Sequence, residues 1–157
     1  WNCHKCGWKG MLREPKPERH YDKPVKTNFS NLSDAGLSYA MTRGLSQSLI
    51  VAEKLAERRG SIVFPYMYDG ELVNFKTRGI SEKKFSQGQN GMQVMYRYDQ
   101  VKNHNTIVIT EGEWDALSLV MAGFPGSTSV SQGAPNERDK KIEADRETRT
   151  RIGVLQL

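Results

Sequence analysis

The chain has 157 residues, of which 37% are hydrophobic and 26% charged, enough for one ordinary domain or one small domain with an appendage. Its 23 Lys and Arg against 18 Asp and Glu give a net charge of +5, which permits a polyanionic partner without requiring one. No run approaches the roughly 18 apolar residues of a membrane span, and two cysteines cannot make a disulfide framework. Transmembrane and disulfide-rich secreted proteins are therefore excluded, and a reducing compartment is expected.

The N-terminal segment WNCHKCGWKG is a compact cluster of Cys, Trp and Gly. Cys3 and Cys6 have the spacing of a zinc knuckle, and Gly7 follows directly. Because a structural zinc site takes four ligands, we expect a second Cys pair upstream of Trp1, in a chain that begins in mid-sequence. Ligation by His20 with one further residue, or two unpaired buried thiols, are the alternatives. The Pro-rich, charged stretch 13–31 is interpreted as a linker.

The next two segments predict short helices, because apolar residues recur at intervals of three or four. Ser33 is a suitable N-cap for the first helix, which should end at Arg43-Gly44. Ser46 is a suitable N-cap for the second, which is expected to continue to residues 58–60.

Extended structure follows. Residues 61–68 and 71–77 are rich in β-branched and aromatic side chains, and Asp69-Gly70 between them is a strong hairpin signal. Alternation along the second strand directs Lys76 and Arg78 to one face. A third short strand should include Lys84 and Phe85. Residues 86–105 are expected to be loop, with an extended piece at 92–96.

A βαβ unit is predicted beyond that loop. Residues 106–110 form a continuous apolar strand of the kind buried on both faces of a parallel sheet. The helix after it presents Trp114 and Leu117 on one face, with Gly123 past its end, and residues 127–131 form the next strand. Residues 136–151 are dense in charge and have few apolar anchors.

Three carboxylates lie at the predicted strand-to-helix junction: Glu111, Glu113 and Asp115. The strand delivers Glu111 to the carboxyl edge of the sheet, where ligand sites of open α/β sheets lie. Together the carboxylates would suit Mg2+, which binds through few carboxylates plus water and substrate phosphates. A simpler role for Glu113 and Asp115 is to complement the dipole of the helix.

A set of cations precedes this junction in the chain: Lys76, Arg78, Lys83 and Lys84. Strand-borne cations beside a metal site are suited to holding a triphosphate and a template backbone. A solvated sheet face is the alternative. The aromatic side chains interleaved with these cations, Phe85 among them, are expected to pack in the core.

The order of these parts resembles the primase half of phage primase-helicases and Twinkle-like proteins, with bacterial-type DNA primase as a more distant relative. The matching segments are WNCHKCGWKG, LSDAGLSYAMTRGLS, IVFPYMYDGELVNFKTRG, KKFSQ and IVITEGEWDALSLVMAGF followed by VSQGAP. The resemblance implies a mixed α/β (α+β) fold: the end of a zinc-binding domain at 1–12, a linker at 13–31, a helical and basic β subdomain of an RNA polymerase domain at 32–100, and the first part of a Toprim domain at 101–157.

The resemblance also implies site roles. Glu111 would be the catalytic glutamate that binds Mg2+, with Glu113 and Asp115 as supporting acids, and Cys3 and Cys6 would bind structural Zn2+. Nucleotide and DNA would be bound by the cations Lys76, Arg78, Lys83 and Lys84. The implied reaction is RNA primer synthesis on single-stranded DNA from ribonucleoside triphosphates, by attack of a 3′-hydroxyl on an α-phosphate, in a protein that works with a helicase domain in cis or in trans.

Further expectations concern context. The protein would act in the cytoplasm of a phage-infected cell or in an organelle, without a membrane partner. Because a Toprim site needs a second, Asp-x-Asp motif that this chain lacks, we expect the polypeptide alone to be inactive. One alternative is an inactive module that binds single-stranded nucleic acid through a degenerate Toprim domain. Another is a topoisomerase or nuclease that uses one of the tyrosines Tyr66, Tyr68, Tyr96 or Tyr98.

Overall fold

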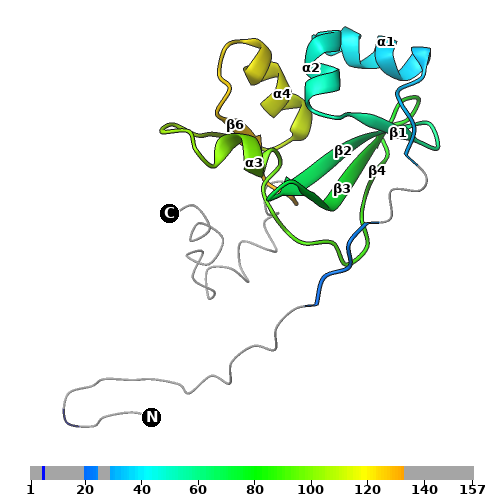
Figure 1. Cartoon of the computed structure of the whole chain (residues 1–157). Helices are drawn as coiled ribbons and strands as arrows, with labels where there is room; N and C mark the ends of the chain where they lie inside the picture. The colour runs from blue at the N-terminus through cyan, green and yellow to red at the C-terminus, as the bar shows by residue number, and fades with distance from the viewer. Residues whose placement is uncertain (1–4, 6–19, 25–28, 133–157) are drawn as a thin grey trace.

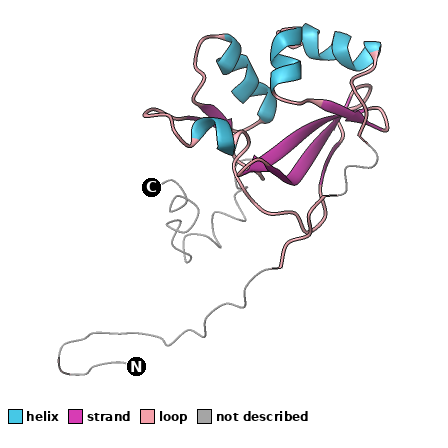
Figure 2. Cartoon of the chain, in the orientation of Figure 1, coloured by secondary structure: helices cyan, strands magenta, loops and turns pink. Residues whose placement is uncertain are grey.

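The structure is a computed structural model that describes residues 5, 20–24 and 29–132. Within this part, a four-stranded antiparallel sheet in the order β1-β2-β3-β4 lies beside a small βαβ unit, and helices cover one face of the sheet (Figures 1 and 2). The mixed α/β class is confirmed. Cys3, Cys6 and the charged segment 136–151 lie outside the described residues. The elements are α1 (Asp34–Thr42), α2 (Gln47–Ala52), β1 (Ala56–Arg58), β2 (Ser61–Tyr68), β3 (Glu71–Gly79), β4 (Phe85–Gln87), α3 (Tyr98–Val101), β5 (Val108–Thr110), α4 (Glu113–Met121) and β6 (Ser127–Ser129).

Helices α1 and α2 begin where the sequence predicts. The hydroxyl of Ser33 accepts a hydrogen bond from the backbone N–H of Gly36, and that of Ser46 accepts one from Leu49, so each caps its helix. Glu57 on β1 also accepts hydrogen bonds from the backbone and hydroxyl of Ser33, at 2.9 and 2.7 Å. The start of α1 is thereby tied to the sheet.

The predicted end of the second helix is wrong. Helix α2 ends at Ala52, Lys54 takes a positive φ of 54°, and residues 56–58 form β1. The segment pairs with the backbone of β2 in antiparallel register, which a further helical turn could not do. Arg59 and Gly60, with φ of 49° and 69°, make the two-residue turn that joins the strands.

The predicted hairpin of β2 and β3 is confirmed. Asp69 and Gly70 both have positive φ, 48° and 79°, as a type I′ turn requires. The carboxylate of Asp99, next to the start of α3, accepts the backbone N–H groups of both turn residues at 2.8 Å. A register shift between Tyr66 and Met67 marks a bulge in β2. Helix α3, which the sequence analysis assigned to loop, therefore holds the tip of the hairpin.

The core lies between the sheet and the helices. Phe64 on β2 makes edge-to-face contacts with Trp114 of α4 and with Tyr96, at ring-centroid distances of 5.0 and 5.9 Å. All three rings are buried, and burying a side chain of this size contributes roughly 2–3 kcal/mol. These contacts join the four-stranded sheet to the βαβ unit. The predicted boundary between residues 100 and 101 falls within α3.

The βαβ unit is present, with β5 and β6 parallel and α4 between them. One expectation about it is wrong, because β5 is not buried on both faces and Ile109 is 51% exposed. Within the described residues β5 pairs with β6 alone, so one of its edges is free, and the face that carries Ile109 is exposed. Among the described residues, no helix is both long and apolar enough to traverse a lipid bilayer.

Candidate active site at the junction of the two units

The register of the sheet decides which way the predicted cations point. Lys76 pairs with Phe64, and Arg78 pairs with Ile62. Because directly paired residues share a face of an antiparallel sheet, both cations lie on the face that carries the core. On the other side of β3, Phe85 pairs with Arg78. Arg78 and Phe85 thus lie on the outer continuation of the core face. We call Lys76 and Arg78 of β3, together with the exposed Lys83 and Lys84 that directly precede β4, the basic face.

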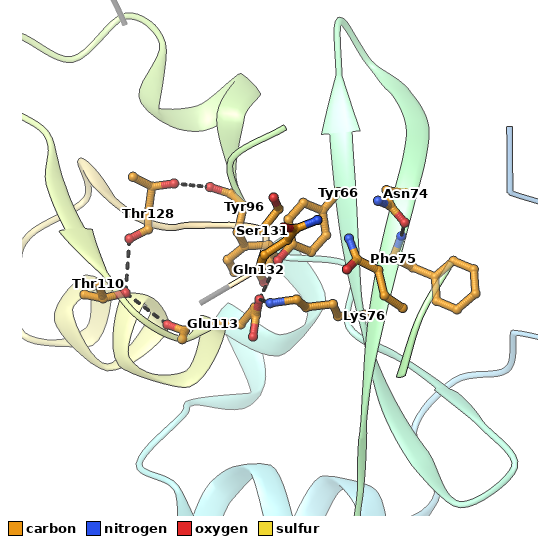
Figure 3. A network of polar contacts seen from close by, with 12 residues as sticks. Tyr66, Asn74, Phe75, Lys76, Tyr96, Thr110, Glu113, Thr128, Ser131 and Gln132 are labelled. Carbon is orange, nitrogen blue, oxygen red and sulfur yellow. Dashed lines mark hydrogen bonds and ion pairs between the residues drawn. The ribbon is translucent and has the colours of Figure 1, made fainter. Parts of the chain in front are cut away.

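A buried polar cluster forms where this face meets α4 (Figure 3). The Oε1 atom of Glu113 accepts hydrogen bonds from the hydroxyl of Tyr66 and from Nζ of Lys76, the latter at 2.8 Å. The side chain of Glu113 is 7% exposed and that of Lys76 is 17% exposed. Burial, with the negative charge of Glu113, raises the pKa of Tyr66. The three side chains join β2, β3 and α4 through one carboxylate oxygen, and we call them the Glu113 cluster.

The strand-to-helix turn beside this cluster is held by a hydroxyl. The Oγ1 atom of Thr110 lies 3.0 Å from the carbonyl oxygen of Gly112 and 3.1 Å from that of Thr128, so it can donate to either. The carbonyl of Gly112 in turn accepts the N–H of Ala116 at 3.1 Å, which begins α4. The turn places Glu111 and Asp115 at the surface while Glu113 points inward. The three predicted acids therefore occupy two different environments.

The described residues offer few donors for a divalent cation. Among them, no three His, Cys, Asp or Glu side chains gather as a metal site. The exposed carboxylate of Glu111 fits Mg2+ as a single protein ligand, since Mg2+ is held by one or two carboxylates with waters and substrate phosphates. Glu113 does not fit, because its Oε1 already accepts from Tyr66 and Lys76. The predicted zinc ligands Cys3 and Cys6 lie outside the described residues, so the zinc site stays a prediction.

The remaining cations lie at the outer end of the same face. The guanidinium of Arg78 donates to the carbonyl oxygens of Gly79 and Glu82 and lies over the ring of Phe85, 5.0 Å from its centroid. Lys83 and Lys84 are exposed, and neither forms an ion pair with another described residue. The expectation that Phe85 packs in the core is wrong, because its side chain is 57% exposed.

Polar side chains that the sequence analysis did not single out line the same junction. Gln93 accepts a hydrogen bond from the hydroxyl of Ser131 at 2.9 Å and lies 3.4 Å from the amide of Gln132. Figure 3 draws Ser131 and Gln132 together with the Glu113 cluster. Gln93 lies in a stretch without periodicity, so no local pattern indicated it. Tyr66 was indicated as a core aromatic and as one of four tyrosines open to a topoisomerase or nuclease role, but not as a partner of Glu113.

Comparison with known proteins places this geometry in context. No protein-family model matches the chain. It is 30% identical over 155 residues to a primase homolog protein of Arabidopsis thaliana, an alignment that covers 90% of this chain and 46% of the relative. It is 29% identical over 156 residues to a chloroplastic/mitochondrial Twinkle homolog protein of the same plant, covering 90% of this chain and 22% of the relative. The chain thus spans less than half the length of either.

Solved structures share the fold at low sequence identity. The zinc-binding and RNA polymerase domains of the Aquifex aeolicus primase match with a TM-score of 0.58 and 12% identity, over 72% of this chain and 40% of that one. The primase fragment of the bacteriophage T7 primase-helicase matches with a TM-score of 0.53 and 20% identity, over 84% and 59%. A DnaG primase catalytic domain bound to single-stranded DNA matches with a TM-score of 0.54 and 13% identity, over 69% and 52%.

Proposed function

We propose that this chain, which is similar over 90% of its length to a primase homolog protein and shares the fold of solved primase domains, is the part of a DNA primase that holds single-stranded DNA and nucleotide during RNA primer synthesis. The observation that carries the proposal is the junction itself. Lys76, at the inner end of the basic face, is joined to α4 through Glu113 at 2.8 Å, beside the strand-to-helix turn that exposes Glu111.

Each cation has a distinct part in this proposal. Arg78, Lys83 and Lys84 are the groups available to phosphates, since the latter two are exposed and Arg78 lies at the same end of the sheet. Lys76 is mostly buried and already paired with Glu113. It therefore contributes positive potential at the junction, where a triphosphate would approach, and it keeps the acidic turn beside the basic sheet.

Mg2+ would be bound by the carboxylate of Glu111. A bound Mg2+ would neutralise phosphate charge and orient an α-phosphate toward a 3′-hydroxyl. The protein's own contribution is to fix the turn through Thr110 and to keep Glu113 out of the metal's reach in a buried ion pair. Cys3 and Cys6 are proposed to bind structural Zn2+ together with further ligands.

The first test is template-directed primer synthesis by the gene product that carries these 157 residues, with Mg2+, ribonucleoside triphosphates and single-stranded DNA. Glu111→Gln should abolish the product while thermal unfolding stays within about 1 °C of the wild type, because Glu111 is exposed and a surface substitution changes stability little. Full primer yield from the Glu111→Gln variant would contradict the assignment of Glu111.

A second test addresses the cations on the 157-residue chain itself. For single-stranded DNA, the logarithm of the affinity falls with the logarithm of the salt concentration by about 0.7 per phosphate contact. Lys84→Ala should therefore weaken oligonucleotide binding and reduce that slope by about 0.7. Lys54→Ala, at an exposed lysine outside the basic face, is the matched control and should leave the slope unchanged. Equal effects of the two substitutions would contradict a role for the basic face.

The alternative function, an inactive module that binds single-stranded nucleic acid, has one observation in its favour. Within the described residues only Glu111 and Asp115 of the three acids remain open to a metal, since Glu113 is tied to Lys76 and Tyr66. DNA binding that persists without Mg2+ and after Glu111→Gln, in a gene product that makes no primer, would favour the module over the enzyme.

A further inference from the structure

An exposed aromatic side chain sits at the outer end of the basic face. Phe85 begins β4, which is the last strand of the four-stranded sheet in the described residues. Its side chain is 57% exposed, although a phenyl ring of this size is ordinarily buried. Within the described residues Arg78 covers one side of the ring, and more than half of the side chain stays open to a ligand.

The surroundings of Phe85 hold the ring in place on one side and leave it open on the other. Arg78, directly opposite on β3, lies over the ring with its guanidinium carbon 5.0 Å from the centroid. That guanidinium is itself fixed, because it donates to the carbonyl oxygens of Gly79 and Glu82. The ring is therefore backed by a cation that cannot easily turn away. The rest of the ring surface is exposed.

Two further cations directly precede the ring in the chain. Lys83 and Lys84 are both exposed, and the backbone between β3 and β4 is closed by hydrogen bonds from Gly79 to Lys84 at 2.9 Å and from Lys84 to Glu82 at 2.8 Å. The tight turn keeps both lysines beside the ring. Cations that follow a phosphate backbone, combined with an open aromatic face for bases, are how proteins bind single-stranded nucleic acid without reading its sequence.

We propose that Phe85 is a stacking platform for a nucleobase of the single strand whose phosphates contact Lys83 and Lys84. This inference rests on the proposed function, and it adds a base-binding position that the cations alone do not supply. The second exposed Phe in this part of the chain, Phe124, has similar exposure, 53%, and lies just past the end of α4 between Gly123 and Pro125. It has no lysine or arginine adjacent in sequence and provides the matched control.

The experiment measures binding of the 157-residue chain to a fluorescent oligothymidylate of about 12 nucleotides, within the usual site size of such proteins, by fluorescence anisotropy. Phe85→Ala should weaken binding at least about fivefold, as expected for the loss of one stacked base. Phe85→Trp should keep or strengthen it, and Phe124→Ala should leave it unchanged. An abasic strand of equal length should bind the wild type and Phe85→Ala equally. Circular dichroism of each variant shows whether it is folded.

A second readout separates stacking from a structural effect. The fluorescence introduced by Phe85→Trp, relative to the wild type, should be quenched by oligothymidylate and not by the abasic strand. Quenching by a ribonucleoside triphosphate but not by the oligonucleotide would overturn the assignment to a strand and identify a mononucleotide base as the ligand.

The remaining outcomes distinguish the two proposals. If Lys84→Ala weakens binding while Phe85→Ala does not, the platform is refuted and the proposed function stands. If the wild-type chain binds neither strand at low salt, both are refuted. Equal loss from Phe85→Ala on the thymidylate and the abasic strand would also refute stacking, because no base is then involved.

Discussion

The Glu113 cluster allows a quantitative test of how the sheet is joined to α4. Replacing Glu113 with Ala removes the acceptor of both Lys76 and Tyr66. The side chain of Lys76, which is 17% exposed in the structure, then lacks its carboxylate partner. Breaking a buried ion pair costs about 3–5 kcal/mol, and partial exposure of Lys76 places the expected cost near about 3 kcal/mol, which lowers Tm by roughly 10 °C for a domain of this size.

Two comparisons make the expected cost specific to the cluster. Glu113→Gln keeps an oxygen that can accept from Tyr66, so it should cost about 1–2 kcal/mol. Glu71→Ala breaks the Lys23–Glu71 ion pair, whose side chains are 72% and 61% exposed, and it should cost less than about 1 kcal/mol. Both ion pairs are short, 2.8 and 2.6 Å, so the comparison isolates burial.

The assay is urea unfolding followed by far-ultraviolet circular dichroism, with a double-mutant cycle of Glu113→Ala and Lys76→Met. The cycle should give a coupling of at least about 1 kcal/mol, since directly paired residues are not additive. If Glu113→Ala costs no more than Glu71→Ala, or if the two substitutions in the cycle are additive within about 0.5 kcal/mol, the cluster does not join the two units in the way argued above.

Three further predictions concern stability. Desolvation alone would raise the pKa of Asp99, but hydrogen bonds from Gly70, Lys102 and Asp69 outweigh it and lower that pKa. The stability that Asp99 contributes is therefore present above the unfolded pKa of about 4 and is lost as pH falls through the lower folded pKa. Asp99→Asn should flatten the decline of unfolding free energy between about pH 5 and 2. Burial is the largest cause of the raised pKa of Tyr66. The stability contributed by the neutral phenol is therefore present below about pH 10 and is lost as pH rises further. Tyr66→Phe should reduce that alkaline loss of stability, measured by thermal melting at a series of pH values. Arg97 pairs with Glu53 at 2.9 Å, both side chains being buried, so Arg97→Met should cost about 3–5 kcal/mol in urea unfolding, and a cost under about 1 kcal/mol would contradict a structural role for this ion pair.

Local signals predicted the starts of elements well. Ser33 and Ser46 cap α1 and α2, and Asp69-Gly70 forms the hairpin turn, because a cap or a two-residue turn depends on a few neighbouring residues. The order of motifs likewise predicted the similarity to primase homologues that the comparisons found, since motif order is a property of the chain and not of the packing. The helix predicted over residues 53–60 was wrong for the opposite reason, because backbone pairing of residues 56–58 with β2 overrides the local helical pattern.

The candidate site was predicted in its residues and not in its arrangement. Glu111, Glu113 and Lys76 were all identified, yet nothing local distinguishes the exposed acid from the buried one two positions later. Glu113 is 37 residues from Lys76 and 47 from Tyr66 in the chain, so the ion pair exists only once β2, β3 and α4 have packed. The same holds for Phe85, whose exposure depends on β4 lying at the edge of the sheet.

The sequence by itself thus determined the starts of α1 and α2, the β2–β3 hairpin, the acidic turn and the cations of β3, because these follow from short-range propensity and motif spacing. The tertiary structure decided which charges are paired and which remain available to a ligand. The reason is physical: the pairing and desolvation of a charge depend on every group that surrounds it, and most of the groups around Glu113, Lys76 and Phe85 come from other elements of the chain.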